Sequence, residues 1–294
     1  MNRVRKQIHY SRAEKEQLTG YHIGVGVLDS GIFPHEDLKD QIRAFRDFTN
    51  KYQLLYDETG HGTHVCGILA GNGRVLHGKY KGMAPCCDLY VGKILNKRGE
   101  GSLKTLLRGL QWLLSIAESC NIRVINISVS SIASARPEEQ RKLYELFQYA
   151  YENNILIVTA AGNFGPGDNT ISRLGDTPYV ICVGCHDGNL ENGGLRCQDC
   201  SGRGPGENVW KKPDVVAPGT QIISCQAAYG KYVARSGTSM ATPIVSGLLA
   251  LAWEKYPYLN AMQLKRKLIL SATDLGESYL MQGAGMVDVE KMLS

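Results

Sequence analysis

Short apolar runs rich in β-branched residues alternate with helical patterns along this chain, and this alternation restricts the fold more than any other feature. The predicted strands cover residues 23–28, 89–95, 123–129, 155–159 and 179–183, and the predicted helices cover residues 64–70, 103–119, 138–151, 242–254 and 262–270. Parallel strands need long crossover connections, which are usually helical. The alternation therefore predicts parallel strands in a layered α/β fold.

Composition supports one globular domain and excludes several classes of protein. The chain has 294 residues, of which 43% are hydrophobic and 21% are charged, so it is long enough to bury a sizeable core. The net charge of +5 is spread along the chain, which argues against a nucleic-acid partner. No apolar run approaches the roughly 18 residues of a membrane span. Nothing in the sequence specifies an oligomeric state.

The cysteines and the first residues predict a cytoplasmic protein. Residues 1–7 are basic, but no apolar segment of the kind found in secretory signals follows them. Nine cysteines, an odd number at uneven spacing, favour free thiols in a reducing cytosol. The alternative is that the sequence is a trimmed form of an exported protein.

Four polar residues stand where apolar segments begin or end. Asp29 directly follows the first predicted strand, at the sheet edge where parallel sheets bind ligands. His61 lies between glycines near a predicted helix start, Asn163 follows the strand that ends at Thr159, and Ser239 precedes an apolar helix. Each residue alone is explained as well by a turn or a helix cap. Their combination is what points to chemistry.

Together these residues supply what a serine hydrolase needs. A serine hydroxyl requires a base to take its proton, which an imidazole does near neutral pH when a buried carboxylate fixes its tautomer. A serine at a helix start also places its own N–H beside a developing oxyanion. All seven histidines precede Ser239, which excludes the Ser…Asp…His order of α/β-hydrolases. The order Asp29, His61, Ser239 is that of subtilisin.

The chain resembles the subtilisin-like serine proteases, and within them the compact intracellular bacterial enzymes. The matching motifs are DSG at 29–31, GHGTH at 60–64, AAGN at 160–163, KPDVVAPG at 212–219 and GTSMATP at 237–243. The resemblance implies a three-layer, doubly wound α/β sandwich with a mainly parallel central sheet. It also implies a peptidase domain over residues 20–294, preceded by an N-terminal arm or short propeptide over residues 1–19.

The resemblance further implies a serine endopeptidase that hydrolyses peptide bonds of protein or peptide substrates through an acyl-enzyme. Asp29 would orient His61, and His61 would act as general base and then as general acid. Ser239 would attack the carbonyl, and Asn163 would help to hold the oxyanion. Two alternatives remain open, namely a transpeptidase or cyclase with the same triad, and a catalytically silent pseudoprotease that binds peptides.

Substrate binding is expected to follow the family, in which the substrate adds a β-strand to main-chain groups of the enzyme. The residues implied are Gly99, Gly101, Ser128, Ser130 and Gly162. Where the family usually has Ser-Leu-Gly, residues 128–130 read Ser-Val-Ser, so the side chain of Ser130 predicts a narrowed P1 pocket.

Glu100 is a second departure from the family, because it takes a position usually held by a small residue. A carboxylate there predicts a preference for basic residues further upstream in the substrate.

No cofactor is predicted. The sequence bears on two metals, calcium and zinc. The calcium loop of the family is not recognisable in residues 71–74, which puts calcium dependence in doubt. Two CxxC pairs, Cys182 with Cys185 and Cys197 with Cys200, have zinc-like spacing. Cys182 lies in a predicted strand, where positions three apart face opposite ways, so Cys182 and Cys185 cannot easily bind one ion. We therefore favour free thiols over a structural zinc.

Overall fold

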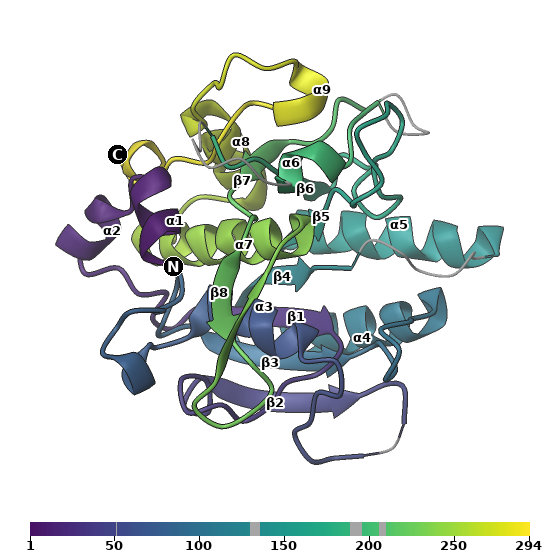
Figure 1. Ribbon diagram of the computed structural model, residues 1–294. Helices are drawn as coiled ribbons and strands as arrows, with labels where there is room; N and C mark the ends of the chain where they lie inside the picture. Colours follow the sequence, from purple (N-terminus) through teal and green to yellow (C-terminus); the bar gives the residue numbers. More distant parts are fainter. Residues whose placement is uncertain (51, 130–135, 189–195, 206–209) are drawn as a thin grey trace.

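A parallel sheet forms the centre of the computed structural model, which describes every residue except 51, 130–135, 189–195 and 206–209 (Figure 1). Among the described residues the sheet has seven strands, and each neighbouring pair runs parallel. In spatial order they are β2 (Ile42–Asp47), β3 (Asp88–Lys93), β1 (Gly24–Asp29), β4 (Ile122–Ile127), β5 (Leu156–Ala160), β6 (Val180–Cys185) and β7 (Val215–Ala217). The predicted α/β class is confirmed.

Helices cover both faces of this sheet, and a two-stranded hairpin lies beside it (Figure 1). The helices are α1 (Asn2–Gln7), α2 (Ser11–Lys15), α3 (His61–Ala70), α4 (Leu103–Ile116), α5 (Pro137–Glu152), α6 (Cys197–Cys200), α7 (Thr238–Lys255), α8 (Ala261–Ser271), α9 (Tyr279–Gln282) and α10 (Val289–Met292). A 3₁₀ turn spans Arg74–Leu76, and the hairpin pairs β8 (Ile222–Cys225) with β9 (Tyr232–Arg235). None of the helices in these ranges is long and apolar enough to cross a membrane.

The side chains of the strands divide between two hydrophobic cores. Val25 and Val27 of β1 belong to a core that also contains residues of α3, α7 and α8, whereas Leu28 belongs to a second core with residues of α4 and α5. Successive strand residues point to opposite faces, so a strand that is covered on both sides is apolar throughout. This packing produces the three expected layers of helix, sheet and helix.

Two helices begin earlier than the sequence pattern predicted, and both differences matter for the site. The apolar pattern predicts helices from residues 64 and 242, but α3 begins at His61 and α7 begins at Thr238. Glycine and hydroxyl residues in these first turns hide the apolar periodicity that marks a helix. As a result, His61 and Ser239 both lie in the first turn of a buried helix.

Residues 1–19 pack against the body of the protein. Val4 and Ile8 are buried, and the carbonyl of Ile8 accepts a hydrogen bond of 2.8 Å from the N–H of Val289. The Tyr10 hydroxyl donates to the carbonyl of Met83 over 2.5 Å. The beginning of the chain therefore lies beside its end (Figure 1).

The two CxxC pairs do not gather at one point. Cys185 of β6 forms a disulfide with Cys197 of α6, with their Cα atoms 5.7 Å apart. Cys182 is buried against Ala161 on a different cluster, because positions three apart in a strand face opposite ways. The expectation of free thiols is therefore wrong for Cys185 and Cys197, although the other seven cysteines are free.

Reduction of this disulfide is expected to destabilise the protein. The bond closes a loop with a sequence separation of 12, and releasing such a loop lowers the free energy of unfolding by about 3 kcal/mol in the chain-entropy description. Urea unfolding with and without a thiol reductant measures this difference. The C185A/C197A variant is the control, and a reductant effect that persists in it would contradict the prediction.

Candidate active site

Asp29 and His61 form a direct contact at the carboxyl end of the sheet. Asp29 is the last residue of β1 and is completely buried. Its Oδ1 lies 2.7 Å from His61 Nδ1 and also accepts a hydrogen bond of 2.7 Å from the N–H of Ser30. Because a carboxylate only accepts, Nδ1 of His61 carries a proton in this contact. In the neutral ring Nε2 is then free of a proton and can act as a base.

The charge of Asp29 decides the protonation of His61. Burial lowers the pKa of His61, but the charge of Asp29 and its hydrogen bond raise it, and the net pKa lies above the ordinary 6.5. Arg235 opposes this rise, and Asp57 adds to it. The site therefore favours the imidazolium form, which is the form that develops when the ring takes a proton from a nucleophile.

Asp57 anchors the beginning of α3 and with it His61. The carboxylate accepts hydrogen bonds from the N–H groups of Gly60 at 2.9 Å and Thr63 at 2.8 Å, and from the Thr63 hydroxyl at 2.6 Å. It also accepts from the Ser30 hydroxyl at 2.8 Å, and that oxygen in turn accepts from the N–H of Gly62 at 2.9 Å. A carboxylate at a helix start satisfies free N–H groups and the helix dipole.

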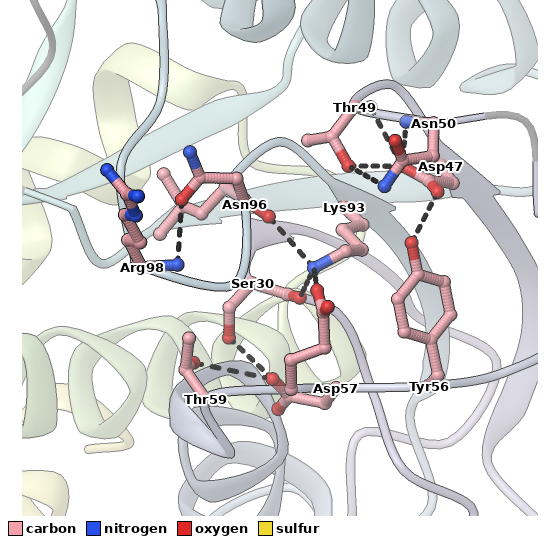
Figure 2. A network of polar contacts seen from close by, with 12 residues as sticks. Ser30, Asp47, Thr49, Asn50, Tyr56, Asp57, Thr59, Lys93, Asn96 and Arg98 are labelled. Atoms are coloured by element: carbon pink, nitrogen blue, oxygen red, sulfur yellow. Dashed lines mark hydrogen bonds and ion pairs between the residues drawn. The ribbon is translucent and has the colours of Figure 1, made fainter.

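Lys93 carries a fully buried charge on the strand beside β1, and Figure 2 shows its ammonium pointing toward Ser30. Lys93 is the last residue of β3 and pairs in register with Asp29. Its ammonium donates to the carbonyls of Ser30 at 2.6 Å and Leu95 at 2.8 Å, and lies 3.2 Å from the carboxylate of Glu58. A buried cation is stable only when it is bonded in this way. Lys93 thus ties together the loops after β1 and β3 and the loop before α3.

Ser239 lies in the first turn of α7, with its hydroxyl partly exposed. The hydroxyl donates to the carbonyl of Ser128 over 2.8 Å, and no hydrogen bond joins it to His61 within the described residues. Rotation about the Cα–Cβ bond of Ser239 would redirect the hydroxyl, and such rotations are fast in accessible side chains.

Asn163 lies after β5 and is held against the start of α7. Its Oδ1 accepts from both the N–H and the hydroxyl of Thr238, each over 3.1 Å. Because only the carbonyl oxygen of the amide can accept from an N–H, this contact fixes the orientation of the side chain. The Nδ2 group is left as a donor near Ser239. Gly237, at φ 138°, has no side chain to crowd this amide.

The predicted substrate-binding residues lie on the loops that follow β3, β4 and β5. Gly101 forms an isolated antiparallel bridge with Leu95, and Ser128 directly follows β4. Gly162 precedes Asn163 with a left-handed φ of 98°. Gly99 also has a left-handed φ, of 75°. Ser130 lies outside the described residues, so the predicted narrow P1 pocket stays a prediction.

His64 has a structural role. Its Nε2 lies 3.0 Å from the carbonyls of both Ile222 and Val233. Burial lowers its pKa to about 3, helped by the charge of Arg235, so the ring stays neutral. It joins α3 to the β8–β9 hairpin.

The residues that follow α3 do not fit a calcium ion. Calcium takes six to eight oxygen ligands, usually including several carboxylates. Here the side-chain oxygen of Asn72 accepts from the N–H of Arg74 over 2.9 Å, and the Arg74 guanidinium pairs with Asp40 at 2.9 Å. A cationic side chain therefore occupies this region. That the chain needs no metal stays a prediction.

Comparison with known proteins decides the family. The profile described as the subtilase family matches residues 20–287. This chain belongs to the subtilase family. The subtilase is 34% identical to the serine protease AprX of Bacillus subtilis (strain 168), over 94% of its own length and 67% of AprX. It is 33% identical to an intracellular serine protease of Paenibacillus polymyxa, over 92% and 80% of the two chains. The solved structure of Sphericase matches with a TM-score of 0.80 and 31% identity, over 92% of both chains.

These comparisons make the subtilase a serine peptidase with the fold that its motifs imply. Three residues that support the site were not predicted from the sequence, namely Asp57, Lys93 and Arg235. The sequence gives a weak indication of the role of Asp57, because acidic residues are common just before a helix. It gives another for Lys93, because a single lysine within an apolar run is usually buried with partners. It gives none for Arg235, since the importance of this residue depends on contacts with a distant segment.

Removal of the Asp57 carboxylate is expected to lower the free energy of unfolding by about 3 kcal/mol, because buried N–H groups at the start of α3 lose their acceptor. Asp57→Ala and Asp40→Ala are compared by urea unfolding in a Ser239→Ala background, which prevents self-digestion. Asp40 pairs with Arg74 in an exposed contact, so its loss should cost less than about 1 kcal/mol. Equal losses in the two variants would contradict the role given to Asp57.

Proposed function

We propose that this subtilase is an endopeptidase that cleaves proteins or peptides through an acyl-enzyme on Ser239. His61 takes the proton of the Ser239 hydroxyl and then delivers it to the leaving nitrogen. Asp29 holds the imidazole in the required tautomer and stabilises the imidazolium. The observation that carries this proposal is the 2.7 Å contact between Asp29 Oδ1 and His61 Nδ1, at the same sheet edge as the start of α7.

The oxyanion of the tetrahedral intermediate would be held by two donors. One is the Nδ2 group of Asn163, which the bonds from Thr238 to Oδ1 leave free. The other is the N–H of Ser239 at the positive end of α7. The acyl part of the substrate would lie along the main chain of Ser128 and the loop at Gly99 and Gly101. Its arrival at Ser128 would release the Ser239 hydroxyl from the Ser128 carbonyl.

Residues 1–19 act as a structural arm in this proposal. The burial of Val4 and Ile8 and the bond between Ile8 and Val289 support this role, because a segment designed for removal would expose this apolar surface. We place the enzyme in the cytoplasm, on its similarity to the intracellular protease of Paenibacillus polymyxa. The Cys185–Cys197 disulfide removes the argument from free thiols, so this placement rests on that similarity alone.

Replacement of Ser239 by alanine is expected to abolish labelling by a fluorophosphonate and to remove cleavage of casein. In subtilisin itself, loss of the nucleophile lowers kcat by a factor on the order of 10⁶. Labelling of the unmodified enzyme at Ser239 would exclude a silent pseudoprotease. Product masses in the presence of an added amine separate hydrolysis from peptide transfer. Casein cleavage that persists in Ser239→Ala would overturn the proposal.

The pH dependence of kcat/KM should show an acidic limb above 6.5. Activity requires neutral His61, and Asp29 raises the pKa of that ring, so activity appears only as pH rises through the raised value. In Asp29→Asn the raising charge is lost, while burial and Arg235 still lower the pKa. The limb should therefore move to lower pH, with a loss in kcat on the order of 10⁴. A limb that stays in place would show that Asp29 does not control His61.

A further inference from the structure

Arg235 places a cationic side chain beside the general base. It is the last residue of β9 and lies four positions before Ser239. Its Nη2 donates to the carbonyl of Thr59 over 2.9 Å. A methyl group built on Gly60, the residue before His61, would lie 3.5 Å from the same nitrogen. The guanidinium therefore lies against the segment that leads into His61.

The charge of Arg235 has no anionic partner within the described part of the chain. No carboxylate there forms an ion pair with Arg235, and its buried Nε has no acceptor. The nearby acidic groups are already engaged, since Glu58 pairs with Lys93 and Asp57 accepts from the start of α3. A guanidinium has five N–H donors, and Arg235 uses one of them in the bond to Thr59, so its Nη groups keep donors for an anionic ligand, whereas the enclosed Nε cannot reach one.

The charge of Arg235 also opposes the protonation of His61. Asp29 at the end of β1 and Asp57 before α3 stabilise protonated His61, whereas Arg235 on β9 destabilises it. An anion bound to Arg235 would screen this repulsion at the step in which His61 becomes charged. A substrate that carries such an anion would therefore be acylated faster.

The position of Arg235 assigns it to the leaving-group side of the substrate. His61 must deliver its proton to the leaving nitrogen, so the residues after the scissile bond lie next to His61. The acyl residues lie instead toward Ser128, whose carbonyl is 2.8 Å from the Ser239 hydroxyl. A side chain beside Gly60 and His61 thus meets the first residues after the cleaved bond.

We propose that Arg235 is a specificity-determining residue that selects an acidic side chain in the first two positions after the scissile bond. The inference rests on the proposed endopeptidase function and names the substrate class for the same site. It is independent of the preference that Glu100 predicts, which is for basic residues upstream of the scissile bond.

The test uses quenched fluorogenic peptides that share one acyl segment and differ only in the residue after the scissile bond, which is Glu, Gln or Lys. We expect kcat/KM for the Glu peptide to exceed that for the Lys peptide by at least about fivefold. This ratio is at the upper end of the effects measured for exposed ion pairs. The ratio should shrink as salt is added, because salt screens such a pair. Equal values for the two peptides would overturn the inference.

Two variants assign the preference to this side chain. Arg235→Met should bring the Glu-to-Lys ratio close to one, and Arg235→Glu should invert it. Arg266→Met is the matched control, because it removes the same charge from an exposed position on α8 and should keep the ratio. A Glu preference that survives in Arg235→Met would refute the assignment. If Arg235→Met cleaves neither peptide, Arg235→Lys decides, since it keeps the charge and must keep the preference.

Fluorophosphonate labelling distinguishes a failure of the Arg235 inference from a failure of the proposed function. An enzyme that labels at Ser239 and cleaves all peptides equally would contradict only the role of Arg235. An enzyme that fails to label and to cleave would contradict the proposed function itself.

Discussion

The buried ammonium of Lys93 is the interaction on which the arrangement of the site depends. It is fully enclosed and bonded to the carbonyls of Ser30 and Leu95 and to Glu58. Ser30 follows Asp29, and Leu95 forms the bridge to Gly101, so a single charge joins the carboxyl end of β1 to the loop expected to bind substrate. Loss of that charge would leave buried carbonyls without a donor and release both loops.

The electrostatics around His61 follow from the same convergence of loops. Asp29 is held on β1, Asp57 on the loop before α3 and Arg235 on the hairpin, and each acts on the same imidazole. Two of these charges favour the protonated ring and one opposes it. The pKa of His61 is thus set by residues that lie far apart in the sequence, and replacement of any one of them would shift it.

Much of the fold and the central part of the site could be predicted from the sequence, because local patterns encode them. The strands around Val25 and Ile125 are apolar on both faces, which marks a covered parallel sheet. The edge strand β2 was not predicted, since its polar residues Arg43 and Arg46 interrupt the apolar run. The motifs around Asp29, His61 and Ser239 indicated the site through their combination and their order along the chain, because each residue alone fits a turn or a helix cap.

Contacts between distant segments explain what the sequence did not predict. The spacing within each CxxC pair suggested a shared metal, but Cys185 meets Cys197 of the other pair. The apolar run around Lys93 indicates burial but not its partners, and Arg235 resembles an ordinary surface residue, so their roles appear only when Ser30 and Gly60 lie beside them. Local periodicity contains no information about such neighbours.

The order in which the site residues occur along the chain has a consequence during synthesis. Asp29 and His61 leave the ribosome early, whereas the nucleophile is reached only at position 239 of 294. The helix that carries it, α7, is buried on nearly all sides and has no stable place until the sheet beneath it has formed. A growing chain therefore holds a base without a nucleophile. In the proposed mechanism, such a chain has no peptidase activity before residue 239 has been made and α7 has packed.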